Sequence, residues 1–500
     1  PKSHCKGISF NHPKEPMTEI TLTPAIKLAQ QVKRKEISAV ELLELHLQRY
    51  RQHNPVINAV IFTQIDHAYE QAQAADEAAA LGKTTGPLHG VPMTIKDSYD
   101  WIGSPSTWGI PELMDNYPEV NAVAVQRLLD AGAIIYGKSN IPHKLSDWQS
   151  FNAIYGTTNN PWDPTRTPGG SSGGAAAALA TGMASLEIGS DIGASIRNPA
   201  HFCGVYGHKP TMGIVPLQGH LLPGDSAYHD ISVGGPLARS ASDLKLALDI
   251  VAGPTGELKK AWQFQLPPPR KNNLSEFKVG VLMESPVCAQ DEELTEQLLD
   301  TVAALGKAGV QIDYAADPGF DWRRYQEVYL LLLRATTSAG YTDEEYEFHL
   351  QSAAARKPDD TRYRAYLDQG ITIRHRDWWA LHDEREQMRL RWRAFFEHYD
   401  LLLCPIAAST AFVHDHMGER PDRTIDINGH QELVVDQLFW AGLSSVVYLP
   451  STVVPAGLTR CGLPCGLQLI APYLEDNTAL QFAQLMEDVI GGFQPPPGYE

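Results

Sequence analysis

Apolar side chains recur at helical spacing through the first fifty residues. They follow Thr23-Pro24, a hydroxyl residue and a proline that suit a helix start, and continue through Val32. Ser38 and Glu41 then have the spacing of a capping box. This pair predicts the start of a second amphipathic helix, which reaches Tyr50.

Strand-like and helix-like segments alternate over the rest of the chain. Short apolar runs predict strands, and longer amphipathic or alanine-rich stretches predict helices. The predicted strands are 56–62, 89–96, 133–137, 279–283, 401–405 and 465–470. The predicted helices are 67–81, 121–131, 173–181, 240–251, 291–308, 322–340, 376–399 and 480–490. The alternation predicts an α/β fold, with a mainly parallel or mixed sheet covered by helices on both faces.

Two stretches stand apart from this pattern. Pro267-Pro-Pro269 and the polar residues after it make 267–275 the clearest linker-like stretch. Residues 1–16 contain no hydrophobic core of a secretory signal, and Met17 is a candidate native start. We therefore interpret residues 1–20 as a leader or an expression remnant.

Composition and charge narrow the classes of partner. The chain is 43% hydrophobic and 20% charged, and its net charge of −18 argues against nucleic acid and against an anionic membrane surface. No apolar run reaches the roughly 18 residues of a membrane span. The six scattered cysteines complete no zinc pattern and are typical of reduced thiols, so we expect a cytoplasmic protein.

Candidate chemistry lies in two glycine-rich serine turns and one lysine. Ser171 lies in Pro168-Gly-Gly-Ser-Ser-Gly-Gly174, and Ser195 follows 24 residues later in Gly189-Ser-Asp-Ile-Gly-Ala-Ser-Ile-Arg-Asn-Pro-Ala200. Lys96 ends the apolar run of Gly90-Val-Pro-Met-Thr-Ile-Lys-Asp97. Glycine turns let backbone N–H groups approach a bound atom. Serines in such turns are candidate nucleophiles, and a lysine among apolar residues is a candidate base.

These three elements and their spacing resemble the amidase signature family, which includes bacterial amidases, fatty acid amide hydrolases and the A subunit of the glutamyl-tRNA amidotransferase. The best-matched part is 88–216, and a weaker resemblance extends from Thr23 to Tyr499. The resemblance implies one large α/β/α unit around a twisted mixed sheet, spanning 21–500. It also implies a variable, substrate-side region at 277–460.

The resemblance further implies a Ser-Ser-Lys triad and an acyl-enzyme. Ser195 matches the nucleophile, Ser171 the bridging serine and Lys96 the base that burial keeps neutral. The family's cis peptide falls at Gly170–Ser171. The backbone N–H groups that match the oxyanion hole are those of Ile192, Gly193, Ala194 and Ser195.

Four neighbours of the triad are interpreted as structural support, namely Gly170, Ser172, Asp191 and Arg197. Ser172 is placed to hydrogen-bond locally, and Asp191 and Arg197 flank the Ser195 turn as a potential ion pair. Ala194 departs from the family, which usually has glycine there; a Cβ restricts the turn if φ must be positive. His208 stands where an apolar residue is usual, which is a milder departure.

Other interpretations of the same residues remain open. Gly169-Gly-Ser-Ser-Gly173 formally matches the nucleophile elbow of α/β-hydrolases, which requires a strand directly before it. The loop lacks the Gly-Lys-Ser/Thr of a phosphate-binding loop, so we reject that function. The chain could also be the glutaminase component of an amidotransferase complex, or a non-catalytic binding protein. His89, His143, His201 and His208 are candidate bases without partner spacing, so satisfied or surface histidines are expected.

The substrate class is inferred from the aromatic second half of the chain. The aromatic residues considered for the pocket are Trp322, Tyr325, Tyr329, Trp378, Trp379, Trp392, Phe395 and Phe396. At helical spacing such residues are usually core, but any that line a pocket favour aryl or long acyl groups. We predict a small-molecule hydrophobic acyl or aryl amide as substrate, with no metal and no organic cofactor. Homo-oligomerisation is possible, and no motif identifies it.

Overall fold

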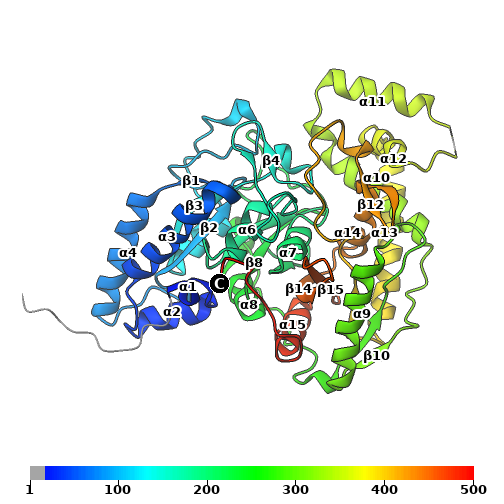
Figure 1. Cartoon of the computed structure of the whole chain (residues 1–500). Helices are drawn as coiled ribbons and strands as arrows, with labels where there is room; N and C mark the ends of the chain where they lie inside the picture. The colour runs from blue at the N-terminus through cyan, green and yellow to red at the C-terminus, as the bar shows by residue number, and fades with distance from the viewer. Residues whose placement is uncertain (1–16, 358) are drawn as a thin grey trace, which may run out of the picture.

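The N-terminal part is a small helix-covered sheet. In the computed structural model, which describes residues 17–357 and 359–500, β1 (Val60–Thr63) pairs antiparallel with β3 (Ala133–Ser139), and β2 (Val91–Lys96) pairs parallel with β3. The helices of this part are α1 (Met17–Leu22), α2 (Ala25–Lys33), α3 (Ala39–Ile57), α4 (Ile65–Ala80) and α5 (Val123–Asp130). Figure 1 shows them on the left, with the C-terminus beside α1 and α2.

The centre of the molecule is an eight-stranded sheet in the order β10-β9-β11-β15-β14-β7-β8-β6. Its strands are β6 (Glu187–Asp191), β7 (Tyr206–Lys209), β8 (Val233–Ala238), β9 (Lys278–Val281), β10 (Gln311–Asp313), β11 (Leu401–Cys404), β14 (Ser451–Leu458) and β15 (Pro464–Ile470). β9 is parallel to β10 and β11, and the other pairs are antiparallel. At the edge strand β6, the sheet packs beside β2, which brings the N-terminal and central sheets together.

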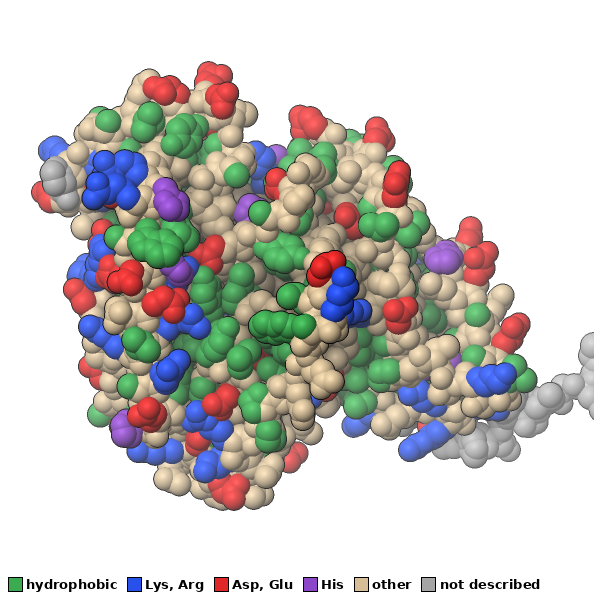
Figure 2. Space-filling model, turned by 180° about the vertical axis from the view of Figure 1, so that it is seen from behind, with side chains coloured by type: hydrophobic (Ala, Val, Ile, Leu, Met, Phe, Trp, Pro, Cys, Tyr) green, Lys and Arg blue, Asp and Glu red, His purple; other side chains and the backbone are tan. Residues whose placement is uncertain are grey.

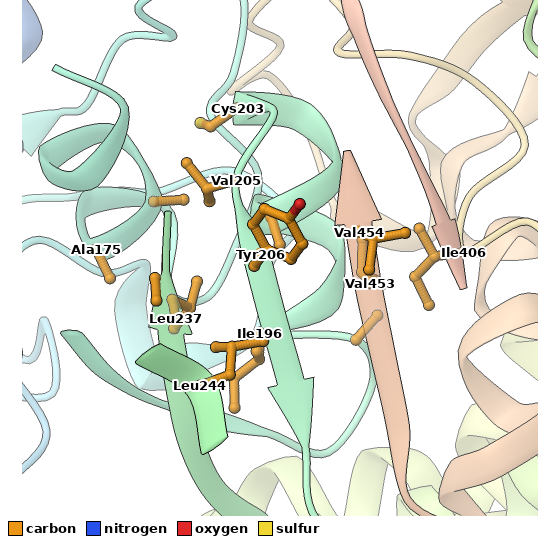
Figure 3. Close-up of a cluster of buried hydrophobic side chains, with 14 of the residues drawn as sticks. Ala175, Ile196, Cys203, Val205, Tyr206, Leu237, Leu244, Ile406, Val453 and Val454 are labelled. Atoms are coloured by element: carbon orange, nitrogen blue, oxygen red, sulfur yellow. The ribbon is translucent and has the colours of Figure 1, made fainter. Parts of the chain in front are cut away.

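Helices cover this sheet in two groups. α6 (Gly173–Ala180) and α7 (Arg197–Cys203) pack against each other and against strands of the sheet; α8 (Ala241–Val251), α9 (Glu292–Lys307) and α15 (Asp476–Ile490) form the second group. Figure 3 shows Tyr206, Leu237 and Val453, from three neighbouring strands, in the buried core with Leu244 of α8. The mixed α/β architecture expected from the sequence is confirmed, in its mixed rather than mainly parallel form.

The second half adds a helical layer beside the sheet. α10 (Trp322–Thr337) packs against α12 (Tyr363–Ile371), α13 (His375–Phe395) and α14 (Leu438–Ser445), and α11 (Asp343–Ala355) lies at the upper right of Figure 1. Two short hairpins complete the fold: β4 (Phe151–Asn152) with β5 (Gly156–Thr157), and β12 (Thr424–Ile427) with β13 (His430–Leu433).

Local sequence signals explain several helix boundaries. Ser38 and Glu41 form both bonds of the predicted capping box at α3, and Ser240 and Asp291 cap α8 and α9. The predicted strand at 56–62 starts too early, because α3 continues to Ile57, past its internal Pro55. Asn58 then ends the helix in a left-handed conformation, and β1 begins only at Val60.

The remaining expectations concern the termini, the linker and the surface. Of the interpreted leader 1–20, residues 1–16 lie outside the described residues, and α1 begins at Met17. In the linker-like stretch, Arg270 bonds to Glu475. Within residues 17–357 and 359–500, none of the helices combines the length and the apolar composition that a membrane span requires. On the face seen in Figure 2, basic side chains are scattered among acidic ones.

Candidate active site

Lys96 is the buried centre of a serine cluster. It ends β2, has no exposed surface, and its Nζ donates to Ser171 Oγ (2.7 Å), Ser172 Oγ (2.9 Å) and Ser190 Oγ (2.9 Å). Burial lowers the pKa of Lys96 to about 7, although Asp191 and Glu187 act to raise it. A lysine with this pKa is largely neutral just above neutral pH, so it can accept a proton from a hydroxyl.

The Ser171 turn is built by close backbone contacts. The Gly170–Ser171 peptide is cis, as expected. A Cβ at residue 170 would collide with the Asp147 carbonyl oxygen, so only glycine fits. Ser172 hydrogen-bonds on both sides of the turn: its Oγ accepts from Lys96, and its N–H donates to the Ser195 carbonyl at 3.0 Å. This last bond joins the two serine turns.

The Ser195 turn is fixed by a buried ion pair at the end of β6. Asp191 and Arg197 are both fully buried and bonded at 2.9 Å, which confirms the expected pair. Burial acts to raise the pKa of Asp191, but Arg197 outweighs this effect and holds the pKa below its usual value. Arg197 also donates to Ser444 Oγ (2.8 Å) and Gln468 Oε1 (2.7 Å). The turn is thereby anchored to α14 and β15.

Ala194 adopts the conformation that its Cβ makes unfavourable. Its φ is +71°, in the left-handed region that favours glycine. Its N–H donates to Asp191 Oδ1 at 2.9 Å. Of the four N–H groups expected to face a substrate oxygen, the one of Ala194 therefore already has an acceptor inside the protein. The N–H groups of Ile192, Gly193 and Ser195 have none among residues 17–357 and 359–500.

The turns open into one cavity. Ser171, Ser195 and Gly193 line a space of about 620 Å³, a size that holds a drug-sized ligand. The Ser195 hydroxyl has no hydrogen-bond partner in the described part of the chain. The cavity therefore presents an unengaged hydroxyl beside unengaged N–H donors, which is an arrangement suited to attack on a carbonyl.

The rings of this cavity differ from the aromatic residues singled out in the sequence. Trp108, Trp148 and Tyr341 line it, and none of the eight residues named above is among its lining residues. Trp322, Tyr325 and Trp392 instead cluster around Phe320 between α10 and α13, while Trp379 is exposed. For Trp322, Tyr325 and Trp392, the helical spacing therefore reflects packing between α10 and α13.

Three residues at the site lie outside the sequence-based set. Ser190 precedes Asp191 in β6 and accepts from Lys96, and its place in the Gly189-Ser-Asp motif was the available signal. Trp148 donates through Nε1 to the Gly193 carbonyl at 2.7 Å. His220 lines the cavity, and burial lowers its pKa to about 3. No sequence motif pointed to the last two.

The histidines considered as bases mostly have structural partners. His208 Nε2 lies 3.1 Å from Asp476 Oδ1 in a fully buried pair, and His201 Nδ1 accepts the Gly466 N–H at 2.7 Å. His89 Nδ1 lies 2.8 Å from Thr85 Oγ1. His143 alone of the four lines the cavity. The elbow alternative fails, because residues 161–172 form no strand before α6.

Comparisons with known proteins agree with this geometry. The family model described as Amidase matches residues 41–480. The indoleacetamide hydrolase of Bradyrhizobium diazoefficiens is 30% identical over 479 residues, covering 93% of this chain and 86% of the relative. The A subunit of a glutamyl-tRNA(Gln) amidotransferase from Picosynechococcus is 30% identical over 493 residues, covering 94% and 98%. A bacterial aryl acylamidase structure matches with a TM-score of 0.79 and 25% identity, covering 96% and 98%.

Proposed function

The chain belongs to the amidase signature family and is a hydrolase of amide carbon–nitrogen bonds; on this premise we propose that Ser195 is its nucleophile, in a triad with Ser171 and Lys96. The observation that carries the proposal is the hydrogen bond between the buried Lys96 Nζ and Ser171 Oγ. The bond joins a lysine whose pKa is lowered to about 7 to one of the two serines that line the cavity, which supports a role for Lys96 as the base.

The proposed proton path starts at the Lys96–Ser171 hydrogen bond, and its second step runs between two serines that line the same cavity. Neutral Lys96 takes the proton of Ser171, Ser171 takes that of Ser195, and Ser195 Oγ bonds to the amide carbonyl carbon. The proton then returns through Ser171 to the departing nitrogen as the carbon–nitrogen bond breaks. Water repeats the cycle on the acyl-enzyme, gives the carboxylic acid and restores the Ser195 hydroxyl.

The negative charge on the carbonyl oxygen needs fixed donors. We propose the N–H groups of Ile192, Gly193 and Ser195, which have no acceptor among the described residues. Ala194, whose N–H donates to Asp191, has a positioning role here. The ion pair of Asp191 and Arg197 holds the turn in place. Trp148 Nε1 also holds it by donating to the carbonyl oxygen of Gly193.

The proposed substrates are amides with a hydrophobic acyl or aryl group. The cavity that contains Ser195 is lined on its apolar side by Trp108, Trp148, Leu217, Leu333 and Leu438. Two similar proteins point in the same direction, because one hydrolyses indoleacetamide and another is an aryl acylamidase. A shallow surface lined only by polar residues would offer hydrophobic acyl or aryl groups no apolar contact.

A glutaminase role within an amidotransferase complex is the second candidate. It is supported by the 30% identity, over 94% of this chain, to the A subunit of an amidotransferase. The same triad would serve that reaction. The two candidates differ in whether the chain acts alone and in whether glutamine is the amide hydrolysed.

Kinetics of the purified chain on a set of amides tests the proposal. Phenylacetamide and benzamide are expected to give higher kcat/KM than acetamide and glutamine. Lys96→Met is expected to abolish turnover of all four. Equal kcat/KM across the series would refute the substrate class. Glutamine turnover that appears only with a partner present would support the second candidate.

A further inference from the structure

A partly buried arginine lies in the wall of the active-site cavity. Arg334 of α10 lines the cavity of Ser195 and also a neighbouring cavity of about 680 Å³. The two cavities share Ser146, Tyr341 and Arg420 as well. Arg334 therefore lies where a substrate held at Ser195 would extend outward.

The guanidinium of Arg334 lacks a counter-ion. Its Nε is buried without a hydrogen-bond partner, and no carboxylate of the described residues forms an ion pair with it. The guanidinium instead lies over the Tyr363 ring, 5.4 Å from its centroid. By contrast, Arg324 on the same helix pairs with Glu327 and Glu384. Partly buried cations normally have acceptors, so an arginine without one that faces a cavity is suited to bind an anionic ligand.

A second arginine lies beside Arg334 in the lining of both cavities. Arg420 lines both cavities and donates to the Ser146 carbonyl, at 2.7 Å. Of the carboxylates that line the two cavities, Asp147 pairs with Arg423, and Glu345 is held in a helix cap. Glu345 accepts the Thr342 N–H in the capping box of α11. The pKa of Arg364 is raised mainly by its hydrogen bond to Asp422, and the negative charge of Glu419 adds to this effect.

We propose that the substrate carries a carboxylate remote from the scissile amide and that Arg334, assisted by Arg420, binds it. This inference rests on the proposed function, because it places the amide at Ser195. A planar guanidinium fork matches a carboxylate with two parallel hydrogen bonds. Within a chain of net charge −18, such a site would select anionic substrates against the overall field of the protein.

Binding to a protein that cannot turn over tests the inference separately from catalysis. Ser195→Ala is titrated with 4-carboxyphenylacetamide and its neutral isostere 4-acetylphenylacetamide, which place the charge on the acyl side. A second pair, the phenylacetyl amides of 4-aminobenzoate and of 4-aminoacetophenone, places it on the amine side. Quenching of tryptophan fluorescence follows binding, since Trp108 and Trp148 line the cavity.

The carboxylate member of one pair is expected to bind about 10- to 100-fold more tightly than its isostere. Adding Arg334→Met is expected to remove this preference, while affinity for the neutral isosteres is kept. Arg334→Lys, which keeps the charge without the fork, is expected to retain part of it. Arg324→Met is the matched control on the same helix, outside the cavity, and should leave the preference unchanged.

Equal affinities within both pairs, or a preference that survives Arg334→Met, would overturn the inference. The proposed function fails by a different result, namely that the wild-type chain hydrolyses no amide of these two pairs. Because binding is measured without the Ser195 hydroxyl, either idea can fail while the other stands.

Discussion

Replacing Lys96 with methionine should abolish hydrolysis and yet make the folded protein more stable at neutral pH. Moving the pKa of a lysine from 10.5 to about 7 corresponds to about 5 kcal/mol, at about 1.4 kcal/mol per pH unit. The folded state bears this cost at pH 7 because the unfolded lysine is protonated there. Lys96→Met removes the cost but also three hydrogen bonds to serines, worth about 1 kcal/mol each. The free energy of unfolding of the variant should therefore be about 2 kcal/mol higher than that of the wild type at pH 7.

The sign of the pH dependence makes this prediction specific. Between about pH 7 and 10.5 the unfolded chain binds a proton at Lys96 that the folded chain does not, so the wild type gains stability as pH rises. The difference between variant and wild type in their free energies of unfolding, called the gap below, should fall by about 2–3 kcal/mol from pH 7 to 9. Below about pH 6 it should be constant, since the lysine is then protonated in both states.

Urea denaturation of both proteins at pH 5, 6, 7, 8 and 9, followed by tryptophan fluorescence, measures the gap. Groups other than Lys96 titrate in both proteins and cancel in the difference. A gap that stays the same from pH 6 to 9 would refute the depressed pKa, and with it the assignment of Lys96 as the base.

Three further predictions concern the same site. The kcat/KM of the wild type should rise with pH through about 7 to a plateau, because neutral Lys96 is the active form; stopped assays from pH 5 to 9 check this, and a rate that falls over that range would contradict it. Ala194→Gly should raise the free energy of unfolding by about 0.5–1 kcal/mol in urea melts, because it relieves the positive φ at the cost of chain entropy; a less stable variant would show that the Ala194 backbone is unstrained. Arg197→Met should lower that free energy by about 3–5 kcal/mol, since it leaves Asp191 buried without its partner; a loss below about 1 kcal/mol would mean that the pair contributes little.

The local part of the site could be predicted from the sequence. The glycine turns around Ser171 and Ser195 can be recognised from a few consecutive residues. The same holds outside the site for the capping box of Ser38 and Glu41. The apolar run that ends at Lys96 likewise forms a fully buried strand. The resemblance to a known family then supplied the order in which these elements act.

The long-range part could not be predicted. Asp243 of α8 accepts the N–H groups of Ala25 and Ile26, and so caps α2 from more than two hundred residues away. Gln468 and Arg197 meet only because α7 packs on β15. Such contacts depend on how helices settle on the sheet, and single-sequence periodicity carries no information about that packing.

The wall of the cavity shows the same limit. The sequence drew attention to the aromatic residues of α10 and α13, whereas Trp108 and Trp148, from irregular segments, line the cavity. Loop residues have no periodicity to reveal their direction. The substrate class is therefore inferred from the assembled structure rather than from composition.

The central claim, that Ser195 is activated by Ser171 and Lys96, is tested most directly by a fluorophosphonate that traps activated serines. Intact mass and peptide mapping of the treated protein should show one adduct, on Ser195, that is absent from Lys96→Met. An adduct on Ser171 instead, or no adduct on the folded wild-type chain, would contradict the account.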